Sequence, residues 1–199
     1  MSPPVFHLLA GPNGAGKSTL YRALVASGTL DGALEFVNAD LYERSHLQHI
    51  ADPQQRSEAA RDWADGRRQA LLQAGIGFVS ETVFSHASKL QLVSRAQALG
   101  YQVVLYVVSV GDRRRLLARV SQRVQEGGHP VPAKRILERY PRSMAHLHKA
   151  VRLADLAFVY DAAEVERGGP VLVALCEKEQ TTWLVKKPPA WVTALLASD

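Results

Sequence analysis

The 199-residue chain contains a single cysteine, Cys176, and no long hydrophobic run. One cysteine cannot form an internal disulfide or a cysteine-based zinc cluster, which argues against a disulfide-stapled or zinc-finger fold. The longest apolar stretch, residues 103–110, is far shorter than the roughly 20 residues that a membrane-spanning helix needs. The first residues lack the basic segment of a secretory signal. We therefore expect a cytoplasmic protein without membrane partners.

Compositional bias is also missing. Hydrophobic residues make up 47% and charged residues 22% of the chain, with 14 glycines and 10 prolines, all near globular averages. These values argue against disorder, collagen-like repeats and coiled coils. A length of 199 residues suits one hydrophobic core, so the sequence predicts a single domain over residues 1–199.

Positive charge is concentrated in one segment. Residues 112–152 hold eleven Lys or Arg residues against three acidic ones, whereas the rest of the chain carries a small net negative charge. Nine of the eleven cations are arginine, whose planar guanidinium binds phosphate oxygens in pairs. The segment predicts a local site for a polyanion, and the alternative is a solvated helical face.

Short apolar runs alternate with amphipathic stretches along the chain. Strands are predicted at residues 5–10, 36–37, 78–79, 101–110, 156–160, 171–176 and 181–185. Helices are predicted at residues 17–26, 57–74, 86–99 and 112–125, from 133 past 140 with an interruption at Pro141, and at 189–197. This alternation predicts a three-layer α/β fold with a mostly parallel sheet and ligands at the carboxyl ends of its strands. The continuous apolar run at 101–110 predicts a central strand.

A phosphate-binding loop follows the first predicted strand. The sequence Gly-Pro-Asn-Gly-Ala-Gly-Lys-Ser at residues 11–18 fits the P-loop pattern and opens a predicted helix, as the mechanism requires. Backbone N–H groups of such a loop surround phosphate oxygens, Lys17 reaches the β- and γ-phosphates, and Ser18 holds Mg²⁺. We predict binding of ATP and Mg²⁺ through Gly11, Asn13, Gly14, Ala15, Gly16, Lys17, Ser18 and Thr19.

Carboxylates follow the next two strands. Asp40 follows the second strand, where it can accept the proton of an attacking hydroxyl, although residues 40–43 also fit a capping box that would start a helix. Glu81 follows the third strand and is a candidate for substrate binding or, through water, for the metal. No conventional strand ending in a metal-binding aspartate is evident. The predicted acceptor site consists of Asn38, Asp40, Glu81 and Thr82, and the predicted metal site of Ser18 and Glu81.

Two sets of arginines flank a glycine–proline break at residues 127–132. Arg115, Arg119 and Arg123 recur every four residues and share one helical face, and Arg135, Arg139 and Arg142 form a similar set after the break. This pattern predicts a helical lid around residues 112–145 that closes guanidinium groups onto the transferred phosphoryl. We assign this catalytic role to Arg119 and Arg123, and expect Arg113 and Arg142 to behave as solvated charge.

These motifs together resemble the small zeta-toxin-like P-loop kinases. The resemblance rests on the phosphate loop, Asn38-Ala39-Asp40, Ser80-Glu81-Thr82, Arg119-Val120 and Arg123-Val124 before the residues Gly-Gly-His-Pro-Val-Pro, and Arg139-Tyr140, and spans about residues 5–161. It implies a nucleoside-kinase-like fold and ATP-dependent phosphorylation of a hydroxyl on a small molecule, such as a nucleotide sugar or amino sugar. It also implies Lys17, Asp40, Arg119 and Arg123 as catalytic residues, and an antitoxin protein as a partner.

Two other functions compete with a small-molecule kinase. The basic segment also suits a kinase or binder of nucleic acid or nucleosides, but a nucleic-acid groove needs aromatic side chains for stacking and only Tyr140 lies there. A regulatory ATPase, with water as the acceptor, would need a hydrolytic glutamate, for which Glu81 is the candidate. The sequence favours the small-molecule kinase, since strand-end carboxylates and an arginine lid both have roles in that reaction.

Overall fold

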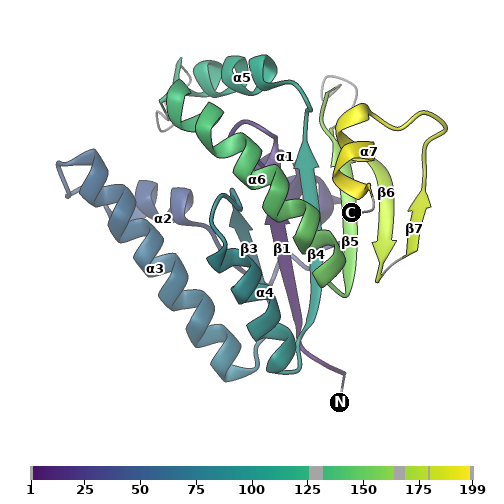
Figure 1. Ribbon diagram of the computed structural model, residues 1–199. Helices are drawn as coiled ribbons and strands as arrows, with labels where there is room; N and C mark the ends of the chain where they lie inside the picture. The colour runs from purple at the N-terminus through teal and green to yellow at the C-terminus, as the bar shows by residue number, and fades with distance from the viewer. Residues whose placement is uncertain (1, 126–131, 164–168, 179, 198–199) are drawn as a thin grey trace.

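The computed structural model describes residues 2–125, 132–163, 169–178 and 180–197, except for the side chain of Arg123. In these ranges the chain forms one seven-stranded sheet with helices on both faces (Figure 1). The strands are β1 Val5–Ala10, β2 Glu35–Val37, β3 Phe78–Thr82, β4 Gln102–Ser109, β5 Leu156–Asp161, β6 Val171–Glu177 and β7 Gln180–Trp183. The helices are α1 Lys17–Ala26, α2 Ala39–His46, α3 Pro53–Ala74, α4 Ser88–Ala98, α5 Arg113–Gln125, α6 Ala133–Leu153 and α7 Ala190–Leu196.

The strand order is β2-β3-β1-β4-β5-β6-β7, and the first five strands in this order are parallel. The strands β6 and β7 extend the sheet by antiparallel pairing. The prediction of a mostly parallel α/β sheet is therefore confirmed. The strand β4 is fourth of the seven and seven of its eight residues are buried, as its continuous apolar run predicted.

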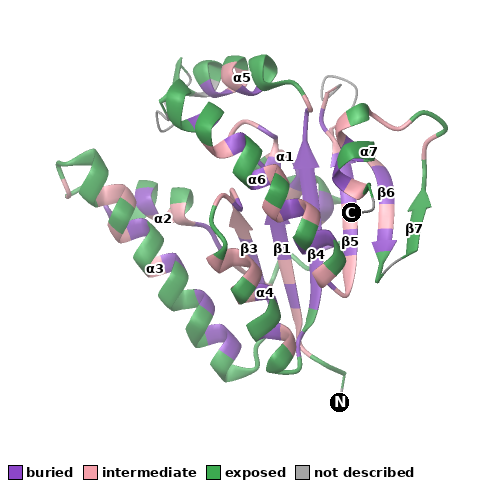
Figure 2. Cartoon of the chain, in the orientation of Figure 1, coloured by how far each residue is buried: buried purple, intermediate pink, exposed green. Residues whose placement is uncertain are grey.

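Helices cover the sheet in two layers of unequal extent. The larger core lies under α3, α4, α6 and α7, and includes Leu71, Val93, Leu147 and Val192. The smaller core lies on the opposite face under α1, with Leu20 and other residues, and Leu116 of α5 joins it. Figure 2 shows α4 and α6 directing buried residues toward the sheet and exposed residues away from it. No described helix has the length and apolarity that a membrane span requires.

Several helices differ from the sequence-based interpretation, and α3, for example, begins at Pro53 instead of residue 57. The predicted interruption at Pro141 is wrong, because α6 continues through it from Ala133 to Leu153. Proline removes one backbone hydrogen bond, but Tyr140, Ser143 and Leu147 are buried around it and hold the helix against the sheet. The capping box at residues 40–43 does not form either, because the N-cap of α2 is Asn38, whose side-chain oxygen accepts from the Leu41 amide at 3.1 Å.

The carboxyl ends of β1, β2 and β3 lie at the same edge of the sheet because these strands are parallel, and this brings three predicted functional segments together. The phosphate loop follows β1, residues 38–40 follow β2, and Glu81 lies near the end of β3. The Gly11 amide donates to the Thr82 carbonyl at 3.3 Å, which ties the loop to β3. Of the predicted glycine–proline break, residues 127–131 lie outside the described residues.

Candidate active site

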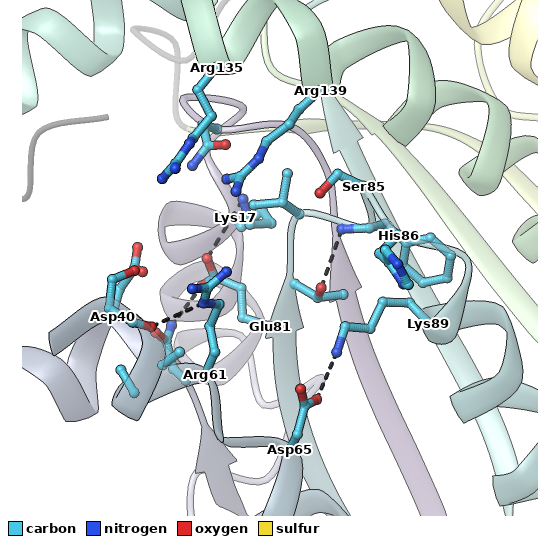
Figure 3. A pocket seen from close by; sticks show the side chains of 18 of the residues that line it. Lys17, Asp40, Arg61, Asp65, Glu81, Ser85, His86, Lys89, Arg135 and Arg139 are labelled. Carbon is cyan, nitrogen blue, oxygen red and sulfur yellow. Dashed lines mark hydrogen bonds and ion pairs between the residues drawn. The ribbon is translucent and has the colours of Figure 1, made fainter. Parts of the chain in front are cut away.

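A cavity of about 460 Å³ opens at this edge of the sheet (Figure 3). Its wall includes residues of the phosphate loop, of α2 and α3, of the segment from β3 into α4, and of α6. Of the predicted site residues, the cavity is lined by Asn13, Gly14, Lys17, Asn38, Asp40, Glu81 and Thr82. The fold therefore brings all four predicted acceptor residues and three of the eight predicted ATP residues to one cavity.

The phosphate loop holds its lysine inside the site. The Lys17 Nζ donates to the carbonyls of Gly11 at 3.0 Å and Pro12 at 3.1 Å, and only 7% of the residue is exposed. Gly14 has a φ of +78°, and a Cβ added there would lie 2.6 Å from the Leu116 carbonyl oxygen of α5. Glycine is needed at this position both for the left-handed backbone and for the close approach of α5.

Glu81 links the phosphate loop to the start of α2. Its Oε1 lies 3.7 Å from the Lys17 Nζ, and its Oε2 accepts from the Ser18 hydroxyl at 3.2 Å and from the Asn38 amide at 2.9 Å. Asn38 is only 5% exposed and also caps α2, so it fixes the position of Glu81 relative to that helix. A single network therefore connects the start of α1 and the residue before α2 with the end of β3.

The pairing of Ser18 with Glu81 fits a Mg²⁺ site. Mg²⁺ prefers hard oxygen ligands and keeps several waters, so one hydroxyl and one carboxylate beside the phosphates of a nucleotide suffice. Among the described residues, no group of three His, Cys, Asp or Glu side chains forms a metal cage. This donor set fits the ion that accompanies a nucleotide better than a permanent structural metal.

Asp40 lies in the first turn of α2, is exposed and lines the cavity (Figure 3). Because Asn38 makes the capping hydrogen bond, Asp40 is not needed to start the helix. Its position suits a general base, but that role stays a prediction.

The arginines that line the cavity belong to α3 and α6. They are Arg61 and Arg68 from α3, and Arg135, Arg139 and Arg142 from α6. Partial burial and the neighbouring charges of Arg135, Arg61 and Arg142 lower the pKa of Arg139. This repulsion among guanidinium groups is unfavourable, and an anion bound between them would offset it. Arg142 is exposed and lines the cavity, and its role as solvated charge stays a prediction.

The α5 arginines have a different location. The Arg119 guanidinium donates to the Ala162 carbonyl at 2.6 Å, and Arg115 donates to the Ala163 carbonyl at 3.1 Å. Arg113 lies 5.1 Å over the Tyr140 ring. None of these three lines the cavity in this conformation, and the side chain of Arg123 lies outside the described residues. The catalytic roles of Arg119 and Arg123 stay predictions, and that of Arg119 requires movement of α5.

Several residues that line the cavity were not predicted from the sequence. Arg68 is 5% exposed, although it belongs to a long polar helix, and it donates to the Ser80 hydroxyl at 3.0 Å and to Asp65. Asp65 also accepts from Lys89 of α4 at 2.7 Å (Figure 3). The seven-residue spacing of Arg61 and Arg68 places both on one helical face, but α3 carries so many charges that this signal is weak.

A phosphate loop between the first strand and helix of such a parallel sheet, with arginines facing the same cavity, defines the class of P-loop kinases. The chain matches the model of the zeta toxin family over residues 2–171, and it therefore belongs to the zeta toxin family. No curated protein sequence matches it.

Solved structures at low sequence identity show the same fold. A structure from the PezAT toxin–antitoxin system of Streptococcus pneumoniae is 17% identical with a TM-score of 0.65, and the match covers 98% of this chain and 83% of that one. The AvrRxo1-ORF1:-ORF2 complex with ATP is 18% identical with a TM-score of 0.68, and the match covers 92% of this chain and 61% of that one. A putative kinase of Chloroflexus aurantiacus is 16% identical with a TM-score of 0.52, over 64% of this chain and 70% of that one.

Proposed function

We propose that the protein transfers the γ-phosphoryl group of ATP to a hydroxyl of a small molecule, with a nucleotide sugar or an amino sugar as the acceptor that the family resemblance implies. The observation that carries this proposal is that Lys17, Asp40, Glu81 and the α6 arginines line one cavity. A phosphate-binding loop, a candidate base and cations for the transferred group are the parts that phosphoryl transfer needs.

In the proposed reaction, the acceptor hydroxyl attacks the γ-phosphorus while its proton passes to the Asp40 carboxylate, and the bond to ADP breaks. Lys17 leaves the carbonyls of Gly11 and Pro12 and contacts the β- and γ-phosphates. Ser18 and Glu81 would hold Mg²⁺, which would neutralise phosphate charge. Arg139 and Arg135 stabilise the negative charge of the transferred group from α6. Closure of α5 adds Arg119 and Arg123.

The nucleic-acid alternative is disfavoured by the one aromatic residue in the basic segment. Tyr140 is only 8% exposed and donates toward the Gly111 carbonyl at 3.5 Å, so its ring is not available for stacking on a base. We also propose an antitoxin protein as a partner, which rests on family membership and on the toxin–antitoxin system to which the Streptococcus pneumoniae relative belongs.

The test is incubation of the protein with radiolabelled ATP and a small-molecule cell extract. We expect one labelled small-molecule product, formed by the wild type and by Lys149→Ala, an exposed lysine of α6 outside the cavity wall. Lys17→Ala should form none of it while remaining folded. Release of inorganic phosphate alone would identify a regulatory ATPase, and labelling of added oligonucleotides instead of the extract would favour the nucleic-acid alternative.

A further inference from the structure

The face of α6 that carries the cavity arginines also carries a histidine. Four residues are spaced by four, three and four positions and therefore share one side of the helix, namely Arg135, Arg139, Arg142 and His146. The three arginines line the cavity, and Figure 3 shows Arg135 and Arg139 reaching from α6 toward Lys17. His146 is partly buried one turn beyond Arg142 and lies outside the cavity wall. The proposed transfer reaction gives it no role.

His146 contacts the segment that leads from β3 into α4. Its Nδ1 lies 3.2 Å from the Phe84 carbonyl oxygen. A carbonyl oxygen only accepts hydrogen bonds, so the Nδ1 atom carries the proton and donates it. Val83, Phe84 and Ser85 all line the cavity. This hydrogen bond therefore joins the helix that carries the arginines to a second wall of the cavity.

The backbone of Phe84 has an unfavourable conformation that its neighbours must hold. Its φ is +61°, a left-handed value that residues with a bulky side chain rarely adopt. Its ring is fully buried in the larger core, its amide donates to the Thr82 Oγ1 at 3.2 Å, and its carbonyl accepts from His146. Such strain persists where the surroundings fix a residue from several sides, and it is concentrated at functional sites. The hydrogen bond from His146 is one of these three restraints.

A chain of hydrogen bonds continues from Phe84 to the phosphate loop. Thr82, whose side chain accepts from the Phe84 amide, also accepts through its carbonyl from the Gly11 amide at 3.3 Å. The Gly11 carbonyl in turn accepts from the Lys17 Nζ at 3.0 Å. His146 is therefore the point at which α6 is tied, through the segment after β3, to the loop that holds the catalytic lysine of the proposed reaction.

We propose that His146 is a positioning residue, which holds Arg139 at the distance from the phosphate loop that phosphoryl transfer requires. This inference rests on the proposed kinase function and adds a residue to it that contacts neither ATP nor the acceptor. Transfer is sensitive to placement, since a shift of about 1 Å can cost a factor on the order of 10² in rate. His146 then determines the rate of transfer, whereas the phosphate loop binds ATP without it.

Two substitutions separate the hydrogen bond of His146 from the packing of its side chain. His146→Leu keeps a similar volume and removes the donor, whereas His146→Asn keeps a nitrogen donor attached to Cγ, as the Nδ1 of histidine is. We expect His146→Leu to lower kcat for the labelled product roughly 10-fold to 100-fold, with the KM for ATP nearly unchanged. His146→Asn should recover most of this loss. Equal kcat values for the two folded variants would overturn the inference, and His146→Ala replaces His146→Leu if the latter does not fold.

His148→Leu is the matched control, because it makes the same chemical change on the same helix. The His148 Nδ1 lies 2.8 Å from the Leu195 carbonyl oxygen of α7, and neither residue lines the cavity. This variant should have a lower melting temperature and an unchanged kcat. If His148→Leu lowers kcat as much as His146→Leu does, the effect comes from the general packing of α6 and the inference is wrong.

A double-mutant cycle tests whether His146 acts through Arg139. If it does, His146→Leu should change kcat by less than about 2-fold in a protein that already carries Arg139→Ala, because the group that His146 positions is gone. Losses that multiply in the double variant would overturn the inference while the proposed function stands. Absence of a labelled product with the wild type refutes the proposed function, and this inference with it.

Discussion

Two roles were open for Asp40, helix capping and proton acceptance, and the structure assigns the capping role to Asn38. Asn38 caps α2 and holds Glu81, whereas Asp40 lines the cavity from the first turn of the helix. If Asp40 is the base, Asp40→Asn should reduce turnover by roughly 10²–10⁴ with the KM for ATP nearly intact. The measurement is steady-state kinetics on the labelled product, together with thermal unfolding.

Asn38→Ala serves as the contrasting variant for Asp40→Asn. Loss of the cap should destabilise the protein by about 1 kcal/mol, and loss of the bond to Glu81 should lower activity as well. Asp40→Asn, in contrast, should leave the melting temperature almost unchanged. Near-normal turnover of a folded Asp40→Asn protein would eliminate Asp40 as the base.

At the scale of elements, α5 and α6 present their arginines to different surroundings. Arg139 lines the cavity among other guanidinium groups, whereas Arg119 binds the Ala162 carbonyl. We predict that Arg139→Ala lowers kcat by roughly 10³-fold or more with only modest loss of ATP affinity. This effect should persist as salt concentration rises, because a group in contact with the transferred phosphoryl is poorly screened.

Arg114 of α5 is the control for Arg139, since it is exposed and lies outside the cavity wall. Arg114→Ala should have a small effect that fades with salt, because exposed charges are screened beyond about 10 Å at 0.1 M. Arg119→Ala measured in the same series decides whether α5 also contributes to the transition state. If Arg139→Ala behaves like Arg114→Ala, the assignment of catalysis to α6 is incorrect.

At the scale of the whole molecule, the C-terminal helix packs against the turn that leads from β4 into α5. The Trp191 indole donates to Asp161 at 2.8 Å, and a Cβ on Gly111 would lie 2.5 Å from the Trp191 ring. Gly111 also has a φ of +66°, which is costly for other residues. Helix α7 therefore packs at the same edge of the sheet as the phosphate loop.

Gly111→Ala should accordingly destabilise the fold by roughly 2–4 kcal/mol, from the left-handed backbone and from overpacking against Trp191. Urea unfolding measures this change. Gly66→Ala is the control, because Gly66 is exposed within α3 and a Cβ there meets no atom within 4 Å. That substitution should stabilise the protein by about 0.5–1 kcal/mol, and equal unfolding midpoints for the two variants would contradict the packing argument.

Features that depend on neighbouring residues in the chain could be predicted from the sequence. The phosphate loop is a local pattern of glycines, lysine and serine, and the apolar runs of β1 and β4 have the composition of buried parallel strands. The rule that parallel strands end at one edge was enough to place Asp40 and Glu81 near the loop, and both line the cavity. The amino-acid sequence by itself therefore determined the fold class, the phosphate loop and the strand-end carboxylates.

Only the tertiary structure decided which charged side chains share the cavity. The arginines of α5 and α6 have similar spacing, so their periodicity could not show that Arg139 lines the cavity while Arg119 binds a backbone carbonyl. Nor could sequence show that Asp65 of α3 meets Lys89 of α4, 24 residues apart. Spacing specifies the face of a helix on which a side chain lies, but the packing of that helix against the sheet determines what the face contacts.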